Sequence, residues 1–135
     1  MVDSLQTQPP PTTFYQLSFP KPGILLVTIN REKQRNSLPS EAHWEGHALF
    51  SWFDEEPSLL VAVVTGAGQK SFCAGQDLTE QNSSRRGPKT AAQQAVMNHP
   101  PTGFMGISQR KGRKPILAAV NGFALGGGFE ICLNW

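Results

Sequence analysis

The chain has few cysteines, little net charge and no long apolar run, and each scarcity excludes a class of protein. Its 135 residues include two cysteines, Cys73 and Cys132, which are far apart and form no CxxC pair. This argues against both a disulfide framework and a zinc cluster, and it predicts an intracellular protein. The cytoplasm, the peroxisome and the mitochondrion are equally compatible with this cysteine usage.

The formal net charge of +2 is too small to indicate a nucleic-acid partner. Basic residues cluster only at Arg85-Arg86 and at 110–114, without interleaved aromatics, as in solvated loops. No apolar run approaches the roughly 18 residues that span a bilayer, so we expect no membrane association. Residues 1–13 have neither the apolar core of a secretory signal nor the arginines of a mitochondrial presequence, and we expect a disordered N-terminal tail there.

Residues 14–135 fit one domain in which short apolar runs alternate with helical periodicity. We expect strands at 14–19, 24–29, 59–64 and 116–120, and helices at 39–56, at 90–98 and, after Pro100-Pro101, up to Arg110. The first two strands should form a hairpin across the turn sequence at 20–23. Residues 81–89 have the composition of a flexible loop. This order of elements predicts an α/β fold with right-handed crossovers.

The most informative stretch is 118–130, where an apolar strand leads into Gly126, Gly127 and Gly128 and then Glu130. Glycine lets a ligand approach the main chain, and the amides that open a helix carry partial positive charge. Backbone donors beside a carboxylate suit a reaction that develops an oxyanion. The glycines can also be read as a tight turn, and Glu130 as an acid that complements the helix dipole.

A second segment, 65–78, also leaves the end of an expected strand. A phosphate-binding loop would need glycine where Gln69 stands, and a dinucleotide fingerprint would need glycine at Ser71, so a nucleotide-binding module is disfavoured. Asp77 resembles a helix N-cap. The amide of Gln76 can point at a ligand oxygen, with Gly127 supplying the second donor that an oxyanion hole requires.

Three ordered segments, 29–38, 63–66 with 72–78, and 114–130, resemble the enoyl-CoA hydratase/isomerase family, the crotonase superfamily. The resemblance implies the N-terminal part of a crotonase-like spiral of ββα units, so that 14–135 forms a partial crotonase-like domain. It also implies an enzyme that binds an acyl-CoA thioester and stabilises its enolate through two backbone amides. Coenzyme A would enter as part of the substrate, with no separate cofactor and no metal.

Carried over by position, the resemblance assigns the two amides to Gln76 and Gly127, and it makes Glu130 one of two glutamates that activate water. It also implies a set of positions that border the CoA moiety. These are Lys33, Arg35, Asn36, Ser37, Ala74, Gly75, Gln76, Asp77 and Leu78.

The second glutamate of the family's hydratases lies further along than Trp135, which is five residues after Glu130. We therefore expect a truncated family member, in which a homo-oligomer forms only if the C-terminal part is present. Two functions stay open. One is a hydratase or double-bond isomerase, and the other is an inactive fragment that binds acyl-CoA or associates with full-length relatives.

Other chemistry-bearing residues have simpler interpretations. His43 and His47 are four apart on the expected helix, but no third metal ligand is evident, so we expect an ordinary half-exposed helix face. Cys73 and Cys132 should be small buried hydrophobes. Phe104 and Met105 should pack in a core, although an acyl channel is an alternative.

Overall fold

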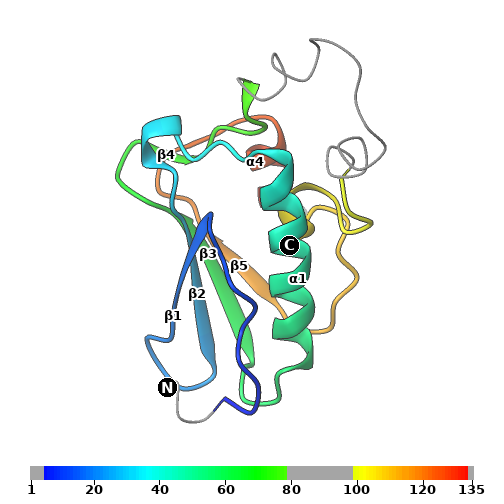
Figure 1. Cartoon of the computed structure of the whole chain (residues 1–135). Helices are drawn as coiled ribbons and strands as arrows, with labels where there is room; N and C mark the ends of the chain where they lie inside the picture. The colour runs from blue at the N-terminus through cyan, green and yellow to red at the C-terminus, as the bar shows by residue number, and fades with distance from the viewer. Residues whose placement is uncertain (1–4, 79–98, 134–135) are drawn as a thin grey trace.

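A computed structural model describes residues 5–78 and 99–133 of the chain (Figure 1). The strands are β1 (Tyr15–Ser18), β2 (Ile24–Ile29), β3 (Val61–Gly66), β4 (Ser71–Cys73), β5 (Ile116–Ala119) and β6 (Phe123–Ala124). The α-helices are α1 (Ser40–Glu55) and α4 (Gly127–Leu133), and single 3-10 turns occur at η2 (Glu32–Gln34) and η3 (Phe104–Gly106). Within these residues no helix is both long and apolar enough to cross a membrane.

Four strands form the main sheet in the order β1-β2-β3-β5. Strands β1 and β2 are antiparallel, and β2, β3 and β5 are parallel to one another. The expected hairpin turn is present: the Ile24 N–H donates to the Lys21 carbonyl at 3.1 Å, and Gly23 has a φ of 83°, which glycine adopts without strain. The predicted α/β class and all four expected strands are thus confirmed, although the strand expected at 59–64 begins two residues later, at Val61.

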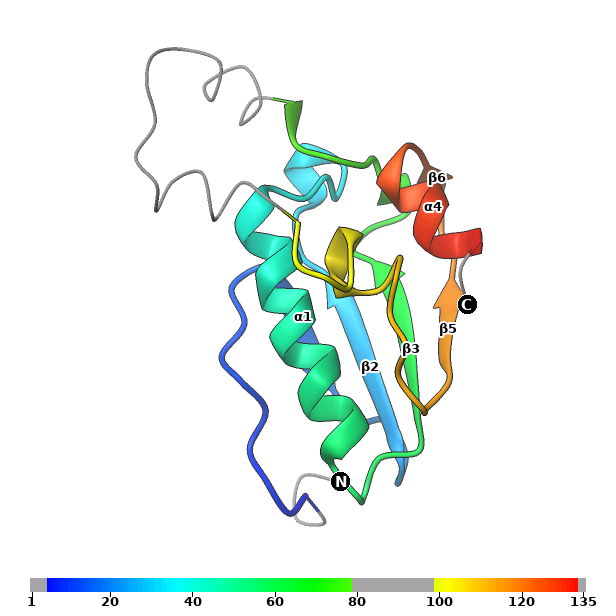
Figure 2. The same ribbon diagram turned by 90° about the vertical axis from the view of Figure 1, so that its right-hand side faces the viewer.

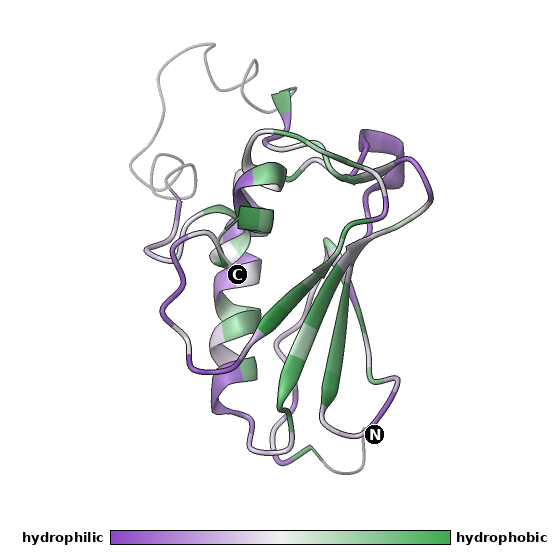
Figure 3. Cartoon of the chain, turned by 180° about the vertical axis from the view of Figure 1, so that it is seen from behind, coloured by the Kyte–Doolittle hydropathy of each residue, from purple (hydrophilic) through white to green (hydrophobic). Residues whose placement is uncertain are grey.

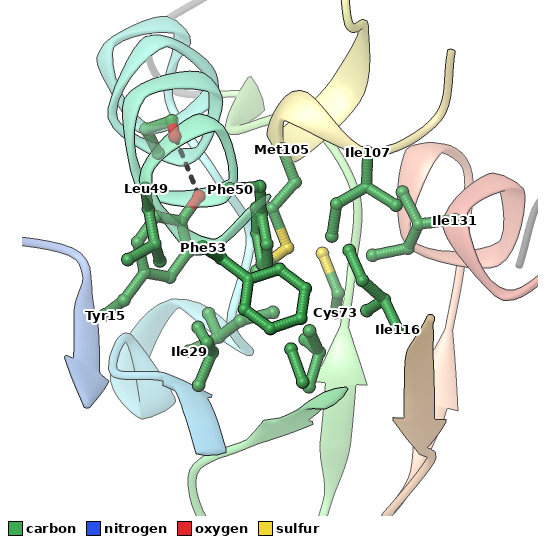
Figure 4. Close-up of a cluster of buried hydrophobic side chains, with 14 of the residues drawn as sticks. Tyr15, Ile29, Leu49, Phe50, Phe53, Cys73, Met105, Ile107, Ile116 and Ile131 are labelled. Atoms are coloured by element: carbon green, nitrogen blue, oxygen red, sulfur yellow. Dashed lines mark hydrogen bonds between the residues drawn. The ribbon is translucent and has the colours of Figure 1, made fainter. Parts of the chain in front are cut away.

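Helix α1 covers one face of this sheet and forms the core with it (Figure 2). Strand β2 alternates so that Leu25, Val27 and Ile29 are fully buried. The helix buries the four apolar positions that gave its periodicity, which are Ala42, Leu49, Phe50 and Phe53. The core extends through Met105, Ile107, Ile116 and Ile131, which brings residues from the second half of the chain against α1 (Figure 4).

The opposite face of the sheet is not covered by any described helix (Figure 3). Leu26, Val63 and Leu117 are cross-strand neighbours there, because Leu26 pairs with Val63 and Val63 pairs with Leu117. Leu26 and Val63 are half-buried, whereas the Leu117 side chain is 55% exposed. Parallel sheets are typically covered on both faces, and the described residues supply a cover on only one.

A second, two-stranded sheet pairs β4 with β6 in parallel and carries α4 at its end. Asn121 joins it to the main sheet: its side-chain amide donates to the carbonyls of Gly66 and Gly68 at 2.9 Å each, and its Oδ1 accepts the Gly66 N–H at 3.0 Å. The two glycine-bearing segments, which are about fifty residues apart in sequence, therefore meet at one end of the molecule.

Residues 5–13 run alongside α1 (Figure 2). The carboxylate of Glu56 accepts the N–H groups of Gln6 and Thr7 at 3.0 and 2.8 Å, and the Trp52 indole donates to the Thr7 hydroxyl at 2.8 Å. Glu56 is fully buried and also accepts from Ser58. The disordered tail expected for 1–13 stays a prediction for solution measurements.

The helical stretch expected up to Arg110 is wrong. Only η3 forms there, because Gly103, Met105 and Gly106 have φ values of 81°, 58° and 71°, which are incompatible with a continuous right-handed helix. The expected loop at 81–89 and helix at 90–98 lie outside the described residues.

Candidate functional site

The backbone around Gln76 is held by Leu38 through a parallel bridge. The Leu38 N–H donates to the Gly75 carbonyl at 2.8 Å, and the Asp77 N–H donates to the Leu38 carbonyl at 2.9 Å. In a parallel bridge with this pattern, the N–H of the central residue points away from the partner strand. The Gln76 N–H is therefore directed to the side opposite Leu38.

The second glycine segment passes close to Gly75. A Cβ placed on Gly75 would lie 2.9 Å from the Leu125 carbonyl oxygen and 3.6 Å from the Gly127 nitrogen. Gly75 has a φ of 97°, so both its conformation and its surroundings require glycine. The structure thus brings the residue before Gln76 into contact distance of Gly127, as an oxyanion hole built from these two amides requires.

The start of α4 also has no room for side chains. A Cβ on Gly127 would lie 2.3 Å from the Phe104 ring, and one on Gly128 would lie 2.1 Å from the Cys73 carbonyl oxygen. The N–H groups of Gly128 and Glu130 donate to the carbonyls of Leu125 and Gly126, which precede α4, at 2.9 Å each, and the Gly127 N–H comes just before them in the first turn. Gly127 and Gly128 therefore allow the start of α4 to pack closely against Phe104 and Cys73, and the Gly127 N–H lies at the start of the helix.

Glu130 lies in the first turn of α4, three residues after Gly127, and is exposed. A carboxylate in this position interacts favourably with the positive end of the helix dipole, which is the simpler role that the sequence also indicates for Glu130. It also lies on the same short helix as the Gly127 amide.

The loop after β2 is shaped by Asn36, whose side chain is fully buried. Its Oδ1 accepts the Arg31 N–H at 3.1 Å, and its Nδ2 donates to the carbonyls of Ala67 and Ser71 at 3.0 and 2.7 Å. These bonds favour the left-handed conformation of Asn36, whose φ is 59°. Asn36, which was assigned to the predicted CoA border, thus fixes the backbone beside β3 and β4.

The other residues assigned to the CoA border occupy the same end of the molecule. Lys33 and Arg35 are exposed, and Ser37 and Ala74 are half-buried. The Arg35 carbonyl accepts the Ser71 hydroxyl at 2.7 Å and the Ala74 N–H at 3.2 Å, which joins the two loops.

The remaining two residues of the predicted border, Asp77 and Leu78, follow the bridge. The Asp77 carboxylate pairs with Arg31 at 2.8 Å. Leu78 is 69% exposed. The helix cap predicted for Asp77 would involve residues outside those described.

The prediction of a half-exposed histidine face is wrong for His43. His43 is fully buried, and its Nε2 lies 2.7 Å from Oε1 of Gln76. His47 is half-buried and bonds the Thr102 hydroxyl at 2.8 Å. The missed signal was positional: His43 precedes the buried Gly46 by three residues and the buried Phe50 by seven, which is the spacing of one helix face.

Cys73 is buried, as expected, and burial raises the pKa of its thiol to about 12, so it is inert at neutral pH. Cys132 is half-buried. Phe104 and Met105 lie in the core, as expected. Across residues 5–78 and 99–133, no three His, Cys, Asp or Glu side chains are grouped so that they could hold a metal ion.

Comparison with known proteins decides the family. The profile of the enoyl-CoA hydratase/isomerase family matches residues 20–134. The chain belongs to the enoyl-CoA hydratase/isomerase family. This confirms the resemblance carried by the three motif segments.

The chain is similar to curated members of the family. It is 47% identical over 133 residues to the mevalonyl-coenzyme A hydratase of Beauveria bassiana, an alignment that covers 93% of this chain and 45% of the relative. It is 39% identical over 114 residues to the carnitinyl-CoA dehydratase of Escherichia coli, covering 82% of this chain and 40% of the relative.

Solved structures of family members have the same fold over the same part of the chain. The structure of the enoyl-CoA hydratase of Bacillus anthracis matches this chain with a TM-score of 0.73 at 32% identity. The match covers 90% of this chain and 45% of the hydratase. The structure of the carnitinyl-CoA hydratase of Mycobacterium avium matches with a TM-score of 0.74 at 33% identity, over 92% of this chain and 44% of the hydratase. The crotonase-like fold is thus confirmed, and the chain spans about half the length of the relatives it matches.

Proposed function

We propose that this chain binds an acyl-CoA thioester and stabilises the enolate of its acyl group with the N–H groups of Gln76 and Gly127. The observation that carries the proposal is the contact between their two segments, in which a Cβ on Gly75 would lie 3.6 Å from the Gly127 nitrogen. Two backbone donors aimed at one oxygen stabilise the charge that develops there, and losing one such donor typically costs about 10²–10³ in rate.

The reaction class that fits this site is addition or removal of water across the bond between carbons 2 and 3 of the acyl group. In hydration, a hydroxyl adds to carbon 3 and a proton adds to carbon 2, and the thioester oxygen carries negative charge in between. The similar proteins named as a mevalonyl-coenzyme A hydratase and a carnitinyl-CoA dehydratase support this class over double-bond isomerisation.

Glu130 is the proposed acid or base of this chain. Its place in the first turn of α4 puts a carboxylate on the element that carries the Gly127 amide. Proton transfer by one positioned carboxylate is worth about 10²–10⁴ in rate. No cofactor other than the CoA of the substrate, and no metal, is part of the proposal.

Binding of acyl-CoA without turnover is the second candidate. It is favoured by the fact that the alignment covers 45% of the mevalonyl-coenzyme A hydratase, so that more than half of that enzyme has no counterpart in this alignment. The two candidates share the oxyanion site and differ in proton transfer. Complete hydration is therefore proposed for a protein of the relatives' length.

The test uses acetoacetyl-CoA, whose enolate has a near-ultraviolet absorption band that the keto form lacks. We expect the purified chain to raise the enolate fraction at pH 7 in a saturable way, and CoA alone to compete. Quenching of Trp44, which is 38% exposed, reports total binding in parallel. Saturable quenching by acetoacetyl-CoA without any enolate band would refute the oxyanion site.

A further inference from the structure

One buried histidine side chain contacts the residues that hold both proposed donors. On helix α1, His43 Nδ1 accepts the Met105 N–H at 2.9 Å, and its Nε2 lies 2.7 Å from Gln76 Oε1. A backbone N–H can only donate, so Nδ1 carries no proton in the neutral ring and Nε2 carries the only one. The hydrogen bond to Gln76 therefore runs from the His43 Nε2–H to the amide oxygen.

The surroundings of His43 keep it in this neutral form. Burial lowers the pKa of His43 from 6.5 to about 4, although the hydrogen bond with Gln76 acts in the opposite direction, and the nearby His99 adds to the lowering. The His99 ring lies edge-on at 4.5 Å between centroids, and the Phe104 ring lies at 4.4 Å. At neutral pH the ring is thus uncharged, in one tautomer, and packed on both sides.

On the side of the first donor, His43 anchors the side chain of the residue whose N–H is proposed to bind the oxygen. The backbone on both sides of Gln76 is already fixed by Leu38. Its side chain is drawn inward to α1 by His43, on a different element. The peptide plane that presents the Gln76 N–H is therefore held both through the main chain and through the side chain.

On the side of the second donor, His43 supports the turn that packs against Gly127. Met105 has a φ of 58°, a conformation disfavoured for a non-glycine residue, and its N–H is the group bonded by His43. The adjacent Phe104 ring occupies the space into which a Cβ on Gly127 would project, 2.3 Å from the ring. A shift of the η3 turn toward α4 would therefore displace Gly127.

We propose that His43 is a positioning residue that sets the separation of the Gln76 and Gly127 amides by bonding Gln76 and the η3 turn at the same time. This inference rests on the proposed function. His43 does not touch the acyl-CoA itself. Its effect is confined to the interaction that grows as charge develops on the thioester oxygen, because CoA and the neutral thioester bind without needing that separation.

Two substitutions at His43 separate positioning from simple packing. His43→Leu fills similar space but neither donates to Gln76 nor accepts from Met105. His43→Gln keeps one donor and one acceptor on a neutral side chain. We expect His43→Leu to lower the enolate fraction of bound acetoacetyl-CoA at least tenfold while CoA affinity changes less than twofold, and His43→Gln to restore the enolate fraction to within about threefold of wild type.

A variant on the partner side covers the case in which His43→Leu does not fold. Gln76→Met removes the acceptor from a half-buried side chain and leaves the backbone N–H in place. We expect Gln76→Met to lower the enolate fraction while CoA affinity changes little. The double variant of Gln76→Met and His43→Gln should lose no more enolate than Gln76→Met alone.

The outcomes distinguish this inference from the proposed function. If wild type forms enolate and both His43→Leu and Gln76→Met retain it, the positioning role is overturned and the proposed function stands. Equal loss of CoA and enolate binding in Gln76→Met would show a structural role alone and would also overturn it. If wild type forms no enolate, the proposed function fails, and this inference fails with it.

Discussion

The Nε2 atom of His43 donates to Oε1 of Gln76 across 2.7 Å, so a fully buried imidazole on α1 holds a residue of the proposed oxyanion site. The first prediction concerns how this contact responds to pH. Since the folded pKa of His43 is lowered from 6.5 to about 4, the unfolded chain binds more protons than the folded one between these values.

Stability should therefore be full above about pH 6.5 and fall as the pH is lowered toward 4. At 1.36 kcal/mol per pKa unit, the loss from this group is roughly 3 kcal/mol. Urea unfolding at intervals between pH 4.5 and 7 measures it, and His43→Gln should flatten the dependence. An unchanged slope in that variant would assign the effect to other groups.

The second prediction concerns the gap between Gly75 and Gly127. Gly75→Ala places a Cβ 2.9 Å from the Leu125 carbonyl at a φ of 97°, so it should cost about 1–3 kcal/mol of stability and widen the gap. Gly23→Ala is the matched control, with a φ of 83° and only the flexible Leu60 side chain nearby. Both variants should unfold more easily, and only Gly75→Ala should lose the enolate band. Loss of the band in both would show that general destabilisation is the cause.

The third prediction tests Glu130 as the acid or base. Glu130→Gln should slow incorporation of solvent deuterium at carbon 2 of a bound acyl-CoA by about 10²–10⁴ and leave binding unchanged. Mass spectrometry of the recovered thioester measures the exchange. Glu41→Gln, which removes an exposed acid from the first turn of α1, is the control and should exchange at the wild-type rate. Equal rates in all three proteins would remove Glu130 from the mechanism and favour binding without turnover.

The fourth prediction concerns the uncovered face of the sheet. Leu26, Val63 and Leu117 form an apolar row across three strands, and contiguous exposed apolar surface binds dyes or other chains. The double substitution Val63→Thr and Leu117→Thr places a β-branched side chain, which strands accept, at both positions. We expect it to lower the fluorescence of a hydrophobic dye several-fold. Leu60→Thr, at a side chain that is 69% exposed but outside the row, should change it little. Similar dye binding by both variants would show that the row does not act as a patch.

The fifth prediction concerns Glu56 and the N-terminal segment. Burial opposes ionisation of Glu56, but hydrogen bonds from Ser58 and Thr7 outweigh it and lower its pKa to about 2. Its contribution to stability is therefore present above about pH 4.5 and is lost as the pH falls from there toward 2. Glu56→Gln should speed hydrogen exchange of the Gln6 and Thr7 amides at pH 6. Rapid exchange of these amides in wild type as well would support the disordered tail predicted from the sequence.

Much of the fold was predictable because its signals are local. Strand β2 and helix α1 follow from the alternation and periodicity of their own apolar residues, and the hairpin follows from Gly23. The approach of Gly75 to Gly127 was predictable from the glycines together with the family resemblance. Each of these features depends on residues that are close in sequence or belong to a long, ordered motif.

The features that were missed depend on contacts between distant residues. Met105 has a left-handed conformation, and its N–H donates to His43, which is 62 residues away, so no local pattern predicts this contact. The left-handed conformations of Gly103, Met105 and Gly106 interrupt the helix expected up to Arg110. His43 itself was assigned to a half-exposed face because no third metal ligand was evident, and its burial is explained only by the partners it finds on other elements.

The most direct measurement is of the two amide protons themselves. In ¹H–¹⁵N spectra of the labelled chain, addition of acetoacetyl-CoA should move the Gln76 and Gly127 amide protons downfield together, with one dissociation constant, because both donate to the same charged oxygen. CoA alone should move neither by a comparable amount. A downfield shift at only one of the two amides, or equal shifts with CoA, would contradict a shared oxyanion site.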